Sequence, residues 1–153
     1  MKNAVYVILF SLLWLVVGCA HRDNGEFSEF YEARTEKPYD DVLAELKIAI
    51  TENNFRITAH SRVGKVIRQR EKIDFPDYDT VSFCNLTHAK KLLLFEPDAV
   101  RHMPCTIVLY SQDGTVLVKT RLLPTNTPDQ KLNKFSKKMN GILTQIVDFS
   151  VEE

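Results

Sequence analysis

Apolar positions recur at helical spacing in two long segments of the chain. Between Pro38 and Asn54 the apolar residues fall on one stripe, and charged residues occupy the opposite stripe. A second helix is predicted after Thr127, which can cap it, with Pro128 at the first helical position and Gln130 placed to close a capping box. The apolar stripe of this second helix consists of Leu132, Phe135, Met139, Ile142, Leu143, Ile146 and Phe149. Each helix is expected to bury one face against another element.

Runs of β-branched and aromatic residues predict strands between these helices. The first strand begins around Phe27, Phe30 and Tyr31, and the others span residues 55–60, 80–86, 106–110 and 115–123. Asp113 and Gly114 join the last two runs and favour a tight hairpin. Shorter helices are predicted at residues 63–70 and 87–95. This order favours an α+β fold, with an antiparallel sheet and helices packed on one face.

Composition and charge limit the organisation and the partners. The chain has 153 residues and is 44% hydrophobic, which suits a single domain, assigned to residues 27–153. Twenty basic and twenty acidic residues leave no net charge, so we expect no nucleic-acid partner. The predicted last helix carries Lys131, Lys134, Lys137 and Lys138 away from its apolar stripe. In a neutral domain these lysines are expected to be a solvated face rather than a binding patch.

The first 18 residues have the pattern of an export signal. Lys2 precedes an apolar run over residues 4–18, which has secretory length and is shorter than the roughly 20 residues that span a bilayer. The run ends in Val16-Val17-Gly18-Cys19, which resembles a bacterial lipobox. The alternative is an ordinary signal peptide with a chance cysteine near its end.

The lipobox resemblance implies a lipoprotein. Cleavage before Cys19 would leave a lipidated cysteine carrying diacylglyceryl and amide-linked acyl chains such as palmitate, and residues 19–26 would form a polar tether. Ala20 stands where many inner-membrane lipoproteins carry Asp, which favours the outer membrane. The expected location is the periplasmic side of the cell envelope, and the expected cofactor is none beyond the covalent lipid.

Several residues resemble the bacterial and archaeal domain-of-unknown-function family 302. They are Phe83-Cys84-Asn85, Ala89, Met103-Pro104-Cys105, Tyr110 and Asp113-Gly114. The resemblance covers about residues 39–124, and it departs at Met103, where Leu is commoner, and at Leu86, where Pro is frequent. It implies a fold like one half of the TATA-box-binding protein and a tendency to dimerise. It implies no activity and no role on DNA.

Cys84 and Cys105 remain as an even pair once Cys19 is assigned to lipid. A disulfide between them is the first expectation in an oxidising compartment. Two reduced or exchanging thiols are the second. The third is a tetrahedral metal site completed by His88 and His102, since two thiolates and two imidazoles suit Zn²⁺ or Cu(I).

No catalytic motif is found in the sequence: there is no phosphate-binding glycine loop, no H-E-x-x-H helix and no evident serine triad. His60 is expected to be structural or exposed, and the acidic residues near Tyr78 are expected to mark a solvated loop; these are Glu71, Asp74, Asp77 and Asp79. The expected function is a non-catalytic binding or adaptor module of the cell envelope, with the membrane, a homodimer partner or an envelope protein as partners. The alternative is a thiol redox or metal-handling protein that uses Cys84 and Cys105.

Overall fold

The computed structural model describes residues 29–152, and the predicted signal peptide, lipobox, Cys19 and tether lie outside the described residues. The elements in chain order are β1 (Phe30–Thr35), α2 (Tyr39–Glu52), β2 (Arg56–Ser61), α3 (Val63–Glu71), β3 (Tyr78–Cys84), α4 (Leu86–Phe95), the 3-10 helix η2 (Pro97–His102), β4 (Cys105–Gln112), β5 (Thr115–Arg121) and α5 (Gln130–Val151). No helix in this described part is long and apolar enough to cross a membrane.

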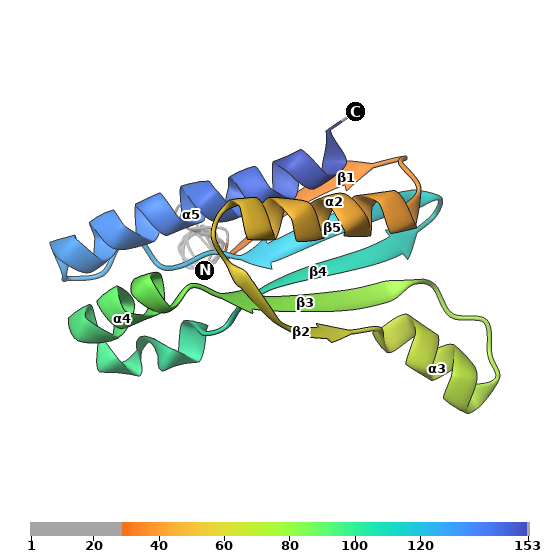
Figure 1. Cartoon of the computed structure of the whole chain (residues 1–153), viewed down its shortest axis with the longest axis horizontal. Coiled ribbons are helices and arrows are strands. Elements are labelled where there is room, and N and C mark those ends of the chain that lie inside the picture. The colour runs from red at the N-terminus through yellow and green to blue at the C-terminus, as the bar shows by residue number, and fades with distance from the viewer. Residues whose placement is uncertain (1–28, 153) are drawn as a thin grey trace, which may run out of the picture.

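The strands form one antiparallel sheet in the order β1-β5-β4-β3-β2. The β4–β5 hairpin turns at Asp113 and Gly114, which have φ values of 51° and 80°. The helices α2 and α5 lie side by side over the sheet, while α3 and α4 lie at its two ends (Figure 1). The predicted α+β architecture is confirmed.

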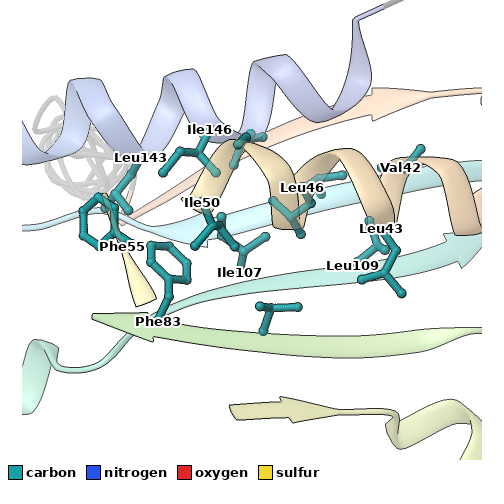
Figure 2. Close-up of a cluster of buried hydrophobic side chains, with 14 of the residues drawn as sticks. Val42, Leu43, Leu46, Ile50, Phe55, Phe83, Ile107, Leu109, Leu143 and Ile146 are labelled. Atoms are coloured by element: carbon teal, nitrogen blue, oxygen red, sulfur yellow. The ribbon is translucent and has the colours of Figure 1, made fainter. Parts of the chain in front are cut away.

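The core lies between the sheet and the pair α2 and α5, as Figure 2 shows. Residues alternate along each strand, so that every second side chain of β3 is buried and the others are partly exposed. Phe83 on β3 meets the apolar stripe of α2 in this core, where Leu46 and Ile50 are fully buried. Burial of such side chains stabilises a fold by roughly 1.5–3 kcal/mol each.

The break predicted at Pro97 is a turn of 3-10 helix. Asn85 caps α4 by accepting a hydrogen bond from the backbone N–H of His88 at 3.1 Å, and Glu96 caps η2 by accepting from Asp98 N–H at 3.2 Å. The element η2 packs on α4, and together they form one end of the molecule (Figure 1).

The capping prediction for the last helix is wrong. Asp129 is the N-cap of α5, and its Oδ1 accepts from the backbone N–H groups of Lys131 and Leu132 at 2.7 and 3.3 Å. Thr127 lies outside the helix because the Asn133 amide binds its backbone N–H at 2.8 Å and its carbonyl at 2.7 Å. The amide thereby fixes Thr127 in the loop before the helix.

The acidic residues near Tyr78 do not all lie in a solvated loop. Asp79 is on β3 and only 4% exposed, with its Oδ2 2.8 Å from His60 Nε2 and 3.9 Å from Arg62 Nε. Asp77 pairs with Arg68 of α3 at 2.7 Å. The expectation for Asp79 is corrected because strand alternation turns its side chain to the buried face. His60 is structural, as one of the two expectations had it.

Candidate binding grooves and the cysteine pair

The face of the sheet opposite α2 and α5 carries a groove. On β4, Ile107 and Leu109 point into the core, so alternation places Thr106, Val108 and Tyr110 on this opposite face. The groove has a volume of about 460 Å³. It is lined by Phe30, Tyr78, Arg101, His102, Pro104, Thr106, Val108, Tyr110, Lys119 and Arg121, and we call it the sheet-face groove.

Aromatic rings and cations alternate along the sheet-face groove. Lys119 Nζ lies 5.1 Å and Arg121 Cζ 5.6 Å from the centre of the Phe30 ring, which is cation–π distance. The rings of Tyr78 and Tyr110 stack across β3 and β4 with centroids 5.5 Å apart and an interplanar angle of 22°. Flat apolar surface and positive charge therefore lie next to each other in this groove.

The charge in the sheet-face groove is only partly compensated. Lys119 lies 3.5 Å from Glu32, and Arg121 lies 2.9 Å from Glu29. No Asp or Glu is among the residues that line the groove. Arg101 forms no ion pair with any residue in the described range 29–152. An anion attached to an apolar ring would meet complementary groups on both sides.

A second groove of about 360 Å³ lies between η2 and the beginning of α5, and we call it the η2 groove. Arg101 and His102 line both grooves, and Ser136 of α5 lines the second. The Nδ1 atom of His102 and the Oγ atom of Ser136 are buried without a hydrogen-bond partner. Because buried polar atoms nearly always have partners, this pair indicates room for a water or a polar ligand group.

His102 is held neutral at the junction of the two grooves. Burial lowers the pKa of its imidazole, and the positive charges of Arg101 and Arg121 lower it further. A neutral imidazole can accept as well as donate a hydrogen bond.

The expected disulfide is not present, because Cys84 and Cys105 are both free thiols. Phe83, and not Cys84, lies opposite Cys105 in the β3–β4 register. The ends of the strands do meet, as expected, and Cys84 and Cys105 line the same small apolar cavity, but no disulfide joins them.

Three of the four predicted metal ligands, Cys84, His88 and Cys105, line the same small apolar cavity, but His102 does not. Within the described residues, no three His, Cys, Asp or Glu side chains are grouped so that they could hold a metal ion. The ring of His88 packs between Phe55, at 5.8 Å between centroids, and Phe135, at 6.3 Å. His102 lies at the two grooves instead. The four-residue site of Cys84, His88, His102 and Cys105 is therefore corrected.

Cys105 borders a small apolar cavity of about 30 Å³, together with Met103 and Met139. Burial raises the pKa of its thiol to about 11, and the neighbouring Cys84 contributes in the same direction. Because the thiolate is the reactive form, Cys105 is an inert, protonated core residue at neutral pH.

Cys105 is expected to make the protein less stable in alkali. Its pKa is about 11 when folded against a reference of 9.0, so its contribution is complete below pH 9 and is lost as the pH rises to about 11. The difference between these two pKa values corresponds to about 2–3 kcal/mol of unfolding free energy. Urea unfolding of wild type and Cys105→Ala between pH 7 and 11 measures this contribution. The difference in unfolding free energy between the two proteins should shrink above pH 9. A constant difference would contradict the assignment.

The sequence interpretation missed the sheet-face groove. Its aromatic and basic residues come from four different strands and from η2, and none of them forms a motif along the chain. The available signal was the alternation in residues 106–110, where a polar or half-exposed position follows each buried one. That alternation identifies an exposed face of the strand. Which residues of other strands lie beside it on that face depends on the strand order in the sheet.

Comparisons with known proteins agree on one family. The family model described as domain of unknown function DUF302 matches residues 31–146, a wider range than the predicted resemblance. No curated protein matches the chain. A crystal structure of an uncharacterised conserved DUF302 protein from Bacillus stearothermophilus superposes with a TM-score of 0.71 at 18% identity, covering 80% of this chain and 98% of that one. That likeness shows a shared fold, and the family match shows that this chain belongs to the DUF302 family.

Proposed function

We propose that this protein is a lipid-anchored binding module on the periplasmic side of the cell envelope, with the outer membrane favoured, and that its sheet-face groove holds the ligand. The anchor rests on the lipobox-like sequence that ends at Cys19. The observation that supports a binding role is the sheet-face groove, which three cations and a stacked pair of tyrosine rings line together. We assign it no reaction, since its lining supplies ring surfaces and cations, the groups of a recognition site.

The ligand class follows from the chemistry of the groove lining. The Tyr78–Tyr110 pair offers a flat apolar platform, and Arg101 offers a guanidinium that no carboxylate of the described residues neutralises. A carboxylate, sulfonate or phosphate joined to an aromatic or other flat apolar body fits both features. We propose this class of amphipathic anion as the ligand.

The redox alternative has weaker support. A catalytic thiol needs a lowered pKa and access to solvent, whereas the pKa of Cys105 is raised by burial. Cys84 lies one residue out of register with it. We propose that a protein partner, either a second copy of this chain or an envelope protein, would bind the same face of the sheet. Such a partner would compete with the small ligand for this face.

The groove is tested by titrating the full chain with 2-naphthoate, an aromatic carboxylate, in a calorimeter. The double variant Arg101→Gln/Lys119→Gln is expected to bind it about tenfold to a hundredfold more weakly, because charge-assisted hydrogen bonds contribute about 1.5–3 kcal/mol each. Lys65→Gln/Arg70→Gln on α3 removes two exposed cations away from the groove and should bind as wild type does. Equal affinity in all three proteins would refute the groove as the binding site.

A further inference from the structure

Half of the exposed large hydrophobic residues in the described part of the chain lie on α4 and η2. Ten large hydrophobic side chains are exposed, and five of them lie on these two elements. These five are Leu86, Leu93, Leu94, Phe95 and Val100. Leu86 is 83% and Leu94 73% exposed, so neither contributes to the core. Clustered exposed apolar residues on a folded protein usually mark an interaction surface.

Lysines lie next to Phe95, which is one of these exposed hydrophobic residues. A shallow groove of about 420 Å³ between α4 and α5 is lined by Phe95, Phe135 and four lysines. The lysines are Lys91, Lys131, Lys134 and Lys138. We call these six residues, together with Leu86 and Leu94, the lysine–leucine patch. Three of the lysines expected on the solvated face of the last helix, Lys131, Lys134 and Lys138, thus line a groove together with residues of α4.

The lysine–leucine patch has an uncompensated positive charge. None of its four lysines takes part in an ion pair with another residue of the range 29–152. No Asp or Glu lines the groove between them. Lys138 and Lys91 both lower the pKa of His88, which shows that their charges act on the same place. The protein is neutral overall, so this charge is local to one end of the fold.

The described chain begins at the same end of the molecule. Phe30, the first residue of β1, lines the sheet-face groove together with Arg101 and His102 of η2. The elements α4 and η2 pack on each other there, and α3 lies at the opposite end of the sheet (Figure 1). Nine residues lie between Cys19 and Glu29, and the ten residue steps from one to the other span at most about 35 Å when extended. A lipid on Cys19 would therefore attach the described domain to the bilayer at this end, which carries α4 and η2.

We propose that the lysine–leucine patch docks on a membrane surface that contains anionic phospholipid. This proposal rests on the lipid anchor proposed above for its orientation, and on the patch itself for its chemistry. Exposed leucines can enter the boundary between headgroups and acyl chains while lysines meet the phosphates, which is how amphipathic surfaces bind membranes. An anionic bilayer complements both features at once, since its phosphates match the four unpaired lysines and its acyl chains match the leucines.

Lysine acetylation footprinting of the full chain tests the docking. The protein is purified from membranes and reconstituted into vesicles of phosphatidylcholine alone or of phosphatidylcholine with phosphatidylglycerol. On the anionic vesicles, acetylation of Lys91, Lys131, Lys134 and Lys138 is expected to slow about fivefold, which matches the attraction of about 1 kcal/mol per lysine near such a surface. Lys65 and Lys72, exposed at the α3 end, are the internal control and should react equally fast on both vesicles.

Two variants separate docking from general proximity to the bilayer. Leu86→Ser/Leu94→Ser changes only exposed side chains and should lose most of the protection. The matched change Val66→Ser/Ile73→Ser, at side chains 56% and 49% exposed near the other end, should keep it. Equal protection on both vesicle types, or equal protection of Lys65, would overturn the proposal. Protection by polyglutamate but not by anionic vesicles would also overturn it, in favour of an acidic protein partner.

The proposed lipid anchor is tested by a separate experiment. In cells, Cys19→Ser is expected to leave uncleaved precursor or to move the protein to the soluble fraction, whereas the leucine variant should stay attached to membranes. If Cys19→Ser changes neither processing nor attachment, the proposed anchor fails, while the vesicle footprint still decides the patch.

Discussion

Gly64→Ala is expected to destabilise the fold by about 2–4 kcal/mol, one of the largest effects of any single methyl group in this protein. A Cβ at this position would lie 2.4 Å from the carbonyl oxygen of Pro76 and 2.7 Å from the backbone nitrogen of Tyr78. Both neighbours are backbone atoms, so they cannot move away by a change of rotamer. Because Gly64 has no side chain, α3 can pack closely against the residues that lead into β3.

Gly141→Ala is the matched control for this prediction. Gly141 lies on α5, and a Cβ there would meet no atom within 4 Å. Replacing an unhindered helical glycine by alanine is expected to stabilise the protein by about 0.5–1 kcal/mol. Urea unfolding followed by far-ultraviolet circular dichroism measures both variants. If both variants changed the free energy of unfolding in the same direction and by similar amounts, Gly64 would not be confined by the backbone around it.

Asn140→Leu is expected to destabilise the protein by about 2–4 kcal/mol. The Asn140 side chain is buried in α5 and binds both backbone groups of Leu123: its Oδ1 accepts from the N–H at 2.8 Å, and its Nδ2 donates to the carbonyl at 2.9 Å. A leucine has the same number of side-chain heavy atoms but is bulkier, and it cannot make either bond. Two buried backbone groups would then lose their partners without access to water.

The control is an asparagine-like side chain on the same helix, the exposed amide of Gln145, which is also replaced by leucine. Gln145→Leu is expected to change the unfolding free energy by less than about 0.5 kcal/mol. Guanidinium unfolding of the two variants in parallel checks the difference. If Asn140→Leu unfolded at the wild-type midpoint, water or a rearranged loop would have to satisfy Leu123. Because Leu123 lines the η2 groove, Asn140 also fixes one wall of that groove.

The local pattern of the sequence was enough to determine the elements and the architecture. Helical spacing in residues 38–54 and 127–149, β-branched runs, and Asp113-Gly114 each specify their structure through neighbours in the chain. The family resemblance at Cys84, Cys105 and the hairpin also came from local motifs and is confirmed by the match over residues 31–146. Helix boundaries were less certain: both Thr127 and Asp129 can cap, and only the contact of Asn133 with Thr127 decides between them.

The candidate sites were decided by the tertiary structure, because each depends on which residues become neighbours across elements. Strand register places Phe83, and not Cys84, opposite Cys105, and no disulfide joins the two cysteines. Strand order brings Phe30, Tyr78 and Arg121 into one groove, and the packing of α4 beside α5 joins Lys91 to the lysines of the last helix. Sequence spacing carries no information on such contacts, because packing of the core sets the distances between elements.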